Sequence, residues 1–284
     1  RMIRHLPAST VRKLGIFAHG EEKVSVHRDE PVFDGQFSNR CYQSAVRQAF
    51  HNFREKAERS GRYNPETDER FTEQWSRIIM HLPYAYQAKR MFPDVFRHDR
   101  EDTEFWEEVA QNLGPAPEPH NSDDPVIIEI WEKAMDGYRR AISKTPQYLE
   151  FHASRIEKGQ RASSLIGNQY TGSIFLALMS SFESDLEEND NLDNQLLGLC
   201  GYGSGAKAKV FEGKVSPRWR EVVSRWNLFE RLAGRVAIDH VTYENLHKGL
   251  QNGSVVEPEG EFALVEITES GVQEGARRYK WIGA

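Results

Sequence analysis

The hydrophobic positions of the chain follow two spacings that alternate along the sequence. Residues 37–58 carry apolar side chains at helical spacing and predict an amphipathic helix. Residues 75–80 form a short apolar run that predicts a buried strand, and residues 195–200 and 206–215 predict two more strands on either side of a turn. Helical and strand patterns that alternate in this way favour an α/β fold over a helical bundle or an all-β sandwich.

Several further segments predict helices and a loop between these strands. Pro83 suits the first turn of a helix that runs to about Phe92, and residues 146–166 have a helical pattern. Residues 173–182 are apolar nearly all round, which is typical of a buried helix. The acidic residues 183–194 that follow predict a loop.

Two other regions are defined by their composition and pattern. Residues 217–250 predict two or three short helices, and residues 260–267 and 277–282 predict a closing pair of strands. Residues 99–145 are acidic, and several prolines interrupt them. We therefore expect a helical acidic insertion at residues 99–145, lying on the surface and without a chemical role.

Composition and charge exclude some classes of protein. The chain has 284 residues, of which 38% are hydrophobic and 28% charged, as in an ordinary globular protein. A net charge of −6 argues against sequence-independent binding to nucleic acid. No apolar run is long enough to cross a bilayer, so no membrane partner is expected. Two cysteines cannot form a disulfide framework, which indicates a reducing compartment, and we expect a cytoplasmic protein.

His81 directly follows the strand predicted at residues 75–80, where α/β folds present ligands. A lone histidine beside a buried strand is more often structural than catalytic. A neutral imidazole can nevertheless donate a hydrogen bond to a ketone oxygen and stabilise the charge that this oxygen gains. Asn168 offers a second donor for the same oxygen or a partner for His81, although an asparagine beside a glycine more often forms a turn.

Residues 201–205 read Gly-Tyr-Gly-Ser-Gly and lie between two predicted strands. Glycines let a ligand touch the backbone and permit backbone angles that other residues resist. Ser204 offers a hydroxyl for a carboxylate or a carbonyl. Taken alone, the segment is more typical of a tight hairpin than of a binding site, because it lacks the features of a phosphate loop or a dinucleotide fingerprint.

Four segments together resemble hydroxymethylglutaryl-CoA synthases of the thiolase superfamily and occur in the same order: residues 31–42, 81–84, 167–173 and 201–205. The resemblance implies an α/β, thiolase-like layered αβαβα fold, in which two related halves stack as five layers. This chain is expected to supply mainly the carboxy-terminal half. Residues 31–284 form that domain on this interpretation, and residues 1–30 are a remnant of the amino-terminal half or an irregular segment.

The resemblance also assigns roles to individual residues. His81 matches the catalytic histidine of the family, which holds the ketone of acetoacetyl-CoA and polarises it for attack. Asn168 and Ser204 match positions that contact the acyl end of the substrate, and Tyr170 is expected to bind substrate beside them.

A second group of residues matches the part of the family site that binds CoA. Ser38 matches a position near the CoA arm, and Arg90 stands where the family often has a lysine for the CoA phosphates. Tyr86 replaces another lysine that is common in the family, so the phosphate contact is expected to pass to Lys89 or to weaken. Acetyl-CoA and acetoacetyl-CoA are expected as substrates, with no cofactor and no metal.

The chain departs from the family at the nucleophile and the base. The family forms an acetyl thioester on a cysteine, and a glutamate removes a proton from that acetyl group. Neither motif is present in this sequence. Cys41 lies in a predicted helix and Cys200 in a predicted strand, where thiols are usually inert packing residues. We therefore expect the chain to need a missing amino-terminal half or a complementary chain, and to form a homodimer as the family does.

The reaction implied by the resemblance joins acetyl-CoA, acetoacetyl-CoA and water to give 3-hydroxy-3-methylglutaryl-CoA for isoprenoid synthesis in the mevalonate pathway. Two alternatives stay open. One is a non-catalytic thiolase-like protein that binds an acyl-CoA or stabilises a partner enzyme. The other is a polyketide β-branching synthase that acts on carrier-bound acyl groups.

Overall fold

The computed structural model describes residues 3–7, 23–27, 35–66, 69–118, 121–122, 124–203, 205–251 and 253–283. The chain divides into two compact units, Arg1–Phe229 and Glu230–Ala284. The sequence pattern did not indicate this division. The boundary expected between residues 30 and 31 lies outside the described residues and stays a prediction.

Three strands form the main sheet of the first unit, in the order β3–β4–β5. β3 (Arg77–Met80) runs parallel to β4 (Leu196–Gly203), and β5 (Lys207–Lys214) returns antiparallel to β4. These strands confirm the three predicted ones, and the Gly-rich segment forms the hairpin between the last two. Because β3 and β4 are parallel, their carboxyl ends lie at the same edge of the sheet. Another antiparallel pair joins β1 (Ile3–Pro7) to β2 (Lys23–His27).

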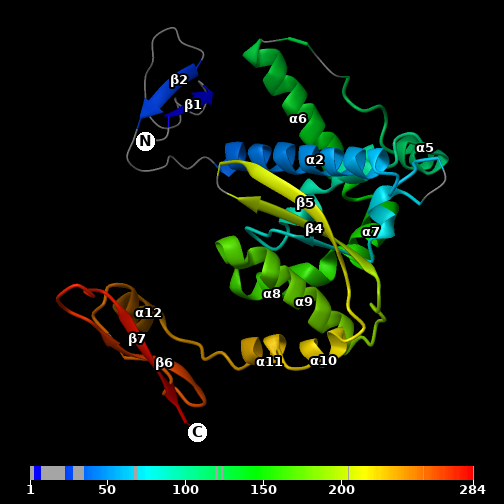
Figure 1. Ribbon diagram of the computed structural model, residues 1–284. Helices are drawn as coiled ribbons and strands as arrows, with labels where there is room; N and C mark the ends of the chain where they lie inside the picture. Colours follow the sequence, from blue (N-terminus) through cyan, green and yellow to red (C-terminus); the bar gives the residue numbers. More distant parts are fainter. Residues whose placement is uncertain are drawn as a thin grey trace. The chain divides into compact units, whose positions relative to one another are not determined.

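Helices cover both faces of the main sheet, as an α/β fold requires (Figure 1). α2 (Gly35–Arg59) packs on β4 and β5 and confirms the helix predicted over residues 37–58. α8 (Glu157–Ile166) and α9 (Ser173–Glu187) lie on the other face and pack against β3. No helix among the described residues is long and apolar enough to cross a membrane.

Further helices belong to the first unit. They are η1 (Phe71–Gln74), α3 (Gln87–Met91), α4 (Pro93–His98), α5 (Glu104–Gln111), α6 (Pro125–Ile142), α7 (Pro146–Arg155), η2 (Tyr170–Gly172) and α10 (Trp219–Val223). α5 and α6 confirm the helical character of residues 99–145. The expectation that this insertion lies on the surface is wrong, because Trp106 and Ile142 are buried in the main core.

The helix expected from Pro83 to about Phe92 begins later than predicted. α3 starts at Gln87, and a second helix, α4, starts at Pro93. Proline lacks the backbone N–H that would continue the preceding helix, but it is well accepted in the first turn of a new one. Pro93 therefore ends one helix and starts the next, whereas Pro83 lies in a bend.

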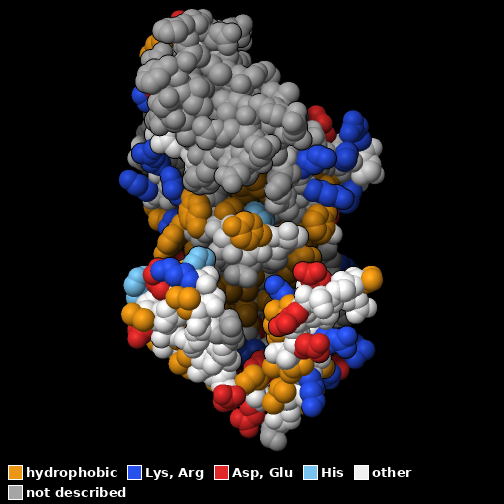
Figure 2. Space-filling model, turned by 90° about the vertical axis from the view of Figure 1, so that its left-hand side faces the viewer, with side chains coloured by type: hydrophobic (Ala, Val, Ile, Leu, Met, Phe, Trp, Pro, Cys, Tyr) orange, Lys and Arg blue, Asp and Glu red, His pale blue; other side chains and the backbone are white. Residues whose placement is uncertain are grey.

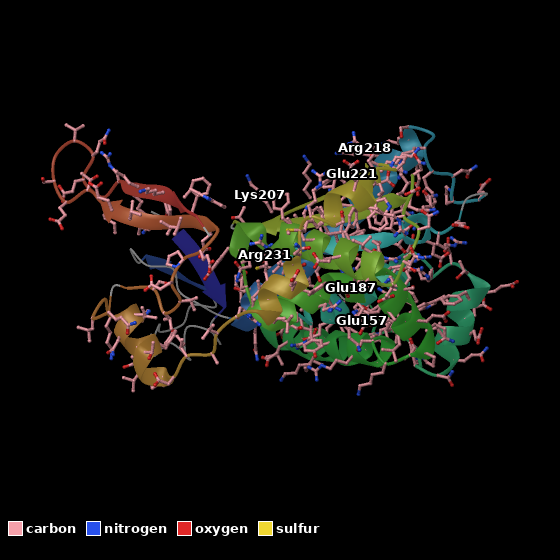
Figure 3. The ribbon with its side chains drawn as sticks, turned by 90° about the horizontal axis from the view of Figure 1, so that it is seen from below. Glu157, Glu187, Lys207, Arg218, Glu221 and Arg231 are labelled. Atoms are coloured by element: carbon pink, nitrogen blue, oxygen red, sulfur yellow. The ribbon has the colours of Figure 1, made fainter. Side chains whose placement is uncertain are left out.

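α9 is longer than predicted and is not buried all round. The acidic residues 183–187, expected in a loop, continue the helix to Glu187. Phe175 is 64% exposed, although the apolar pattern predicted a buried position. Glu187 is exposed, as Figure 3 shows, but Asp185 two residues before it is fully buried. The loop prediction fails because buried partners stabilise the carboxylates within the helix.

Asp185 belongs to a network of two cations and two carboxylates, Arg77, Lys158, Asp185 and Asp190, called here the Asp185 network. The Asp185 carboxylate accepts hydrogen bonds from Arg77 Nη2 at 2.6 Å and Lys158 Nζ at 2.7 Å. Asp190 lies 2.7 and 2.6 Å from the same two cations. Burial lowers the pKa of Lys158, but its hydrogen bonds to the carboxylates outweigh that effect and raise the pKa. The network therefore joins β3 to α8 and α9.

The second unit begins within α11 (Leu228–Ala233) and contains α12 (His240–His247), β6 (Glu261–Ile267) and β7 (Arg277–Ile282). β6 and β7 pair as an antiparallel hairpin. The short helices predicted over residues 217–250 and the closing pair of strands are thus confirmed.

Trp75 is fully buried in the main core, and its ring packs within 4.9 Å of the Phe71 ring centre and 5.9 Å of the Phe50 ring centre. On its other side lies Gly198 of β4. A Cβ atom on Gly198 would come within 2.2 Å of the Trp75 ring. The absence of a side chain at position 198 is what lets the indole lie against the strand.

We expect Gly198→Ala to lower the free energy of unfolding by about 1–3 kcal/mol, because the methyl group overlaps a ring that has no room to move. Denaturant unfolding measures this change. Gly213→Ala in the neighbouring strand is the matched control, since its Cβ would lie 3.5 Å from a Leu199 methyl carbon, an ordinary contact. Equal losses in the two variants would show that the indole does not limit position 198.

Candidate active site

His81 lies at the carboxyl edge of the main sheet, directly after β3. Its backbone N–H donates a hydrogen bond to the carbonyl of Cys200 at 2.9 Å, which continues the pairing of β3 with β4 by one residue. The imidazole is therefore held on a rigid strand end. Tyr202, two residues beyond Cys200 on β4, has its ring centre 6.3 Å from that of His81. The His-Leu-Pro-Tyr motif and the Gly-rich hairpin thus meet, as the sequence predicted.

Tyr42 of α2 completes this group, although sequence analysis did not select it as a site residue. Its hydroxyl donates a hydrogen bond to the backbone carbonyl of His81 at 2.8 Å. Its ring centre lies 4.6 Å from that of Tyr202. The Tyr42 side chain is buried, and burial raises its pKa well above the ordinary value, so the phenol stays protonated and remains a donor. Tyr42 therefore fixes the backbone that carries His81.

The His81 side chain is half-buried, and burial lowers its pKa below the ordinary value of 6.5. Desolvation disfavours the charged imidazolium, so the ring is neutral near pH 7. A neutral imidazole carries one N–H, which can donate to a carbonyl oxygen without adding a fixed positive charge. The position of the His81 imidazole and its neutral state suit a group that polarises a ketone.

The Gly-rich hairpin forms the wall beside His81. Gly205 and Ala206 have φ values of 82° and 55°, so the chain turns through the left-handed region that glycine favours. A Cβ atom on Gly201 would lie 4.0 Å from Cδ1 of Ile174, in the first turn of α9. The start of α9 therefore reaches the carboxyl end of β4. Ser204, assigned to the substrate from the resemblance, lies outside the described residues.

Asn168 lies between α8 and α9, after Gly167 ends α8 with a φ of 76°. Its side-chain oxygen accepts hydrogen bonds from the Tyr170 backbone N–H at 2.7 Å and from the Ser173 hydroxyl at 3.2 Å. Asn168 thus forms a turn, which the sequence had suggested as the alternative to a role in binding. These bonds leave its amide nitrogen as a donor, and they orient that amide from the same loop that brings Ile174 to Gly201.

Among the described residues, no hydrogen bond joins Asn168 to His81. Ile174 and Gly201 connect the Asn168 loop to the edge of the sheet that carries His81. Tyr170 in this loop is 77% exposed, so its ring is open to a ligand. The structure therefore places His81 directly beside the Gly-rich hairpin. The Asn168 loop reaches the same edge of the sheet through Ile174 at the start of α9.

The residues predicted to bind CoA lie on two helices. Ser38 is exposed in the first turns of α2, one turn before Tyr42. Arg90 is exposed on α3, and its guanidinium donates to the Tyr84 hydroxyl at 3.2 Å. Lys89 precedes it and is half-buried, and its backbone carbonyl accepts a hydrogen bond from Tyr148. α3 follows His81 along the chain, so both cations lie on the helix after the strand that ends before His81.

Neither cysteine of the described chain has the surroundings of a nucleophile. Cys200 is fully buried in β4, and burial raises the pKa of its thiol to about 12. Such a thiol stays protonated and unreactive at neutral pH. Cys41 is half-buried within α2. No group of three His, Cys, Asp or Glu side chains in the described part of the chain could hold a metal ion.

Hydrophobic side chains are exposed on the face of the molecule that Figure 2 shows. Three large apolar residues of the α8–α9 region are exposed: Leu165 at 46%, Tyr170 at 77% and Phe175 at 64%. Large apolar side chains exposed in one region of a protein are typical of a surface that another protein segment covers.

Comparison with known proteins gives one consistent result. The family model described as "Hydroxymethylglutaryl-coenzyme A synthase C terminal" matches residues 23–253. A hydroxymethylglutaryl-CoA synthase of Haloferax volcanii is 27% identical over 240 residues, which are 82% of this chain and 51% of that protein. The chain therefore spans about half the length of the curated relatives that it matches.

Solved structures show the same fold. MvaS in complex with 3-hydroxy-3-methylglutaryl coenzyme A has a TM-score of 0.63 and 27% sequence identity, over 90% of this chain and 53% of that one. The HMG synthase of the curacin biosynthetic pathway, in complex with a holo donor acyl carrier protein, has a TM-score of 0.57 and 16% identity over 90% of this chain and 53% of that one. The predicted α/β, thiolase-like fold is thus confirmed.

Proposed function

Because the chain belongs to the hydroxymethylglutaryl-CoA synthase family, we propose that it supplies the carboxy-terminal half of a synthase that condenses acetyl-CoA with acetoacetyl-CoA. Water is consumed, CoA is released, and 3-hydroxy-3-methylglutaryl-CoA is formed for the mevalonate pathway. The observation that carries this proposal is the position of His81. A neutral imidazole lies at the carboxyl edge of the sheet beside the Gly-rich hairpin, as a ketone-binding residue must.

His81 and Asn168 have the roles of hydrogen-bond donors in the proposed reaction. A base removes a proton from the methyl group of an enzyme-bound acetyl thioester, and the resulting carbon nucleophile attacks the ketone carbon of acetoacetyl-CoA. A C–C bond forms, and the ketone π electrons move to the oxygen, which takes up a proton. The imidazole N–H of His81 and the amide of Asn168 donate to that oxygen as its charge grows. A fixed donor costs no reorganisation at that moment, and the bonds to Cys200 and Tyr42 fix His81. Water then hydrolyses the thioester.

The nucleophile and the base of this reaction come, on our proposal, from an amino-terminal half. The family resemblance places a cysteine and a glutamate there, and the curated relatives are about twice as long as this chain. Burial of Cys200, which raises the pKa of its thiol to about 12, supports a nucleophile from elsewhere. We further propose that the exposed side chains Leu165, Tyr170 and Phe175 contact this half, and that the complete enzyme is a homodimer in the cytoplasm.

Free CoA thioesters are the proposed substrates, with Ser38, Lys89 and Arg90 near the CoA arm. Both cations lie on α3, which follows the strand that carries His81, so they suit phosphates of a substrate whose acyl end reaches the imidazole. Sequence identity to the solved structures also favours free CoA over a carrier-bound substrate. It is 27% to the MvaS structure and 16% to the synthase bound to a donor acyl carrier protein.

Condensation measured with acetyl-CoA and acetoacetyl-CoA tests the proposal. We expect turnover when this chain is assembled with an amino-terminal half, and an acetyl adduct in the intact mass of that half only. The chain without that half is the control and should bind acetoacetyl-CoA without turnover. Binding without turnover in the assembled protein as well would favour the non-catalytic alternative. Turnover with carrier-bound but not free acetoacetyl groups would favour the polyketide alternative.

A further inference from the structure

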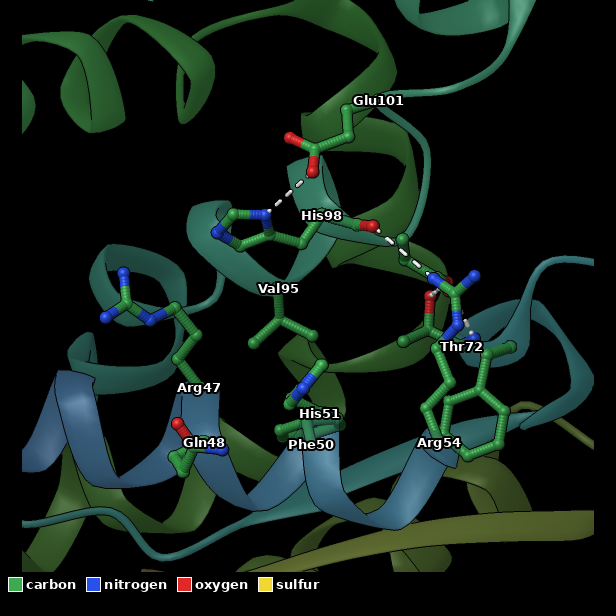
Figure 4. A pocket seen from close by; sticks show the side chains of 11 residues that line it. Arg47, Gln48, Phe50, His51, Arg54, Thr72, Val95, His98 and Glu101 are labelled. Atoms are coloured by element: carbon green, nitrogen blue, oxygen red, sulfur yellow. Dashed lines mark hydrogen bonds and ion pairs between the residues drawn. The ribbon is translucent and has the colours of Figure 1, made fainter. Parts of the chain in front are cut away.

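A cavity lies on the helical layer that α2 forms with α4, and it is called here the α2–α4 cavity. Its volume is about 450 Å³, within the range of small-molecule sites. α2 contributes Arg47 and His51, α4 contributes Val95 and His98, and η1 contributes Thr72 (Figure 4). None of these residues belongs to the site around His81.

Most of the charged groups around this cavity are already compensated. Arg54 pairs with Glu58 at 2.9 Å and lies 3.7 Å from the buried carboxylate of Asp99. Asp99 also accepts hydrogen bonds from the Thr72 backbone N–H at 2.8 Å and hydroxyl at 2.7 Å. Arg54 and Asp99 are therefore each paired with groups of the protein itself.

The opposite wall is compensated in the same way. Glu101 lies 3.2 Å from the guanidinium of Arg97 and 3.1 Å from Nδ1 of His98. Arg97 also lies 3.2 Å from Nε2 of His98, which can only accept a hydrogen bond from a guanidinium. Both ring nitrogens of His98 thus have partners within the protein.

Arg47 is the exception among the charged lining residues. It is half-buried, and it has no hydrogen bond or ion pair within the part of the chain that the structure describes. His51 follows one turn later on the same face of α2, and its Nε2 lies 3.2 Å from Glu55, which leaves Nδ1 unoccupied. A guanidinium without a partner, placed at the edge of a cavity, is a ready binding group for a carboxylate or a phosphate.

Apolar side chains form the floor of the cavity. Phe50, Phe71 and Val95 line it, and each is at most 5% exposed. An inorganic ion would leave this floor in contact with water, whereas a ligand with an apolar body would cover it. Within the described part of the chain, the cavity thus combines the unpaired positive charge of Arg47 with an apolar surface.

We propose that the α2–α4 cavity binds a small organic anion, in which a carboxylate or phosphate pairs with Arg47 and a flat apolar body lies on Phe50, Phe71 and Val95. A carboxylate and a phosphate would pair with Arg47 in the same way, and the experiment described next distinguishes between them. This site is separate from the one proposed around His81, so it does not depend on the condensation activity.

Binding of benzoate, phenyl phosphate and the neutral benzamide to the purified protein tests this proposal. We expect benzoate or phenyl phosphate to bind with a dissociation constant on the order of 1 mM, followed by the NMR signals of the histidine imidazoles. The tighter of the two identifies the preferred head group. Benzamide has the shape of benzoate without its charge and should bind about tenfold more weakly. Inorganic phosphate should bind more weakly than phenyl phosphate, because it lacks the apolar body.

Arg47→Gln should weaken the binding of the tighter probe about tenfold. Arg59→Gln is the matched control, because it removes the same charge from an exposed position of α2 outside the cavity and should leave binding unchanged. Thermal unfolding of both variants checks that they are folded. The proposal is overturned if neither anion binds, if benzamide binds as well as benzoate, or if folded Arg47→Gln binds as tightly as the parent protein.

Discussion

Replacing His81 with alanine is expected to lower the rate of condensation by about 100-fold to 1000-fold in the assembled enzyme, the usual loss for one donor to a developing oxyanion. The imidazole is neutral and fixed on the end of β3, and in the proposed reaction it is the donor that the ketone oxygen meets as its charge grows. Steady-state rates with acetyl-CoA and acetoacetyl-CoA measure the loss.

The same variant separates the role of His81 from a general loss of the site. Acetylation of the enzyme, measured by intact mass, should continue in His81→Ala, because the ketone takes no part in that step. His247→Ala provides the control, since His247 is exposed on α12 of the second unit. Near-normal condensation in His81→Ala, or loss of acetylation to the same extent as condensation, would contradict the proposed role.

Replacing Asp185 with alanine is expected to lower the free energy of unfolding by about 3–5 kcal/mol, the range for removing one partner of a buried ion pair. The carboxylate is fully buried and accepts from both Arg77 and Lys158. Without it, the carboxylates left to these cations among the described residues are Asp190 and Glu188, which are partly exposed. Denaturant unfolding of the variant and the parent protein gives the difference.

Glu187→Ala is the matched control on the same helix. Glu187 forms an ion pair with Arg161 in which both side chains are 46% exposed, so its loss should cost at most about 1 kcal/mol. Similar losses in Asp185→Ala and Glu187→Ala would show that burial of the Asp185 network adds no stability. A larger loss of stability in Asp185→Ala would also indicate that the Asp185 network fixes β3, and with it His81, against α8 and α9.

Local pattern predicted the elements whose signals lie within one segment. The helical spacing of residues 37–58 gave α2 nearly to its ends, and the apolar runs gave β3, β4 and β5 with the Gly-rich hairpin between the last two. Four motifs in order identified the family. His81 could be selected because a strand ends directly before it, and that depends on local sequence alone.

Features that depend on distant partners could not be read in this way. The acidic residues after Phe182 suggested a loop because their buried partners, such as Arg77 for Asp185 and the backbone of Leu228 for Glu183, are far away in the sequence. Tyr42 resembled any apolar position of α2, and only the fold brings its hydroxyl to His81. The turn made by Asn168 was foreseen as an alternative, since it needs only neighbouring residues.

The contact between Gly198 and Trp75 has an evolutionary consequence. A mutation that adds a side chain at position 198 can be accepted only in a lineage whose residue 75 is already smaller, because the indole occupies the space that a Cβ would need. The two positions should therefore covary in an alignment of relatives, with tryptophan at one found almost always with glycine at the other. Frequent pairing of tryptophan with alanine or larger residues would mean that the backbones of those relatives have separated at this point.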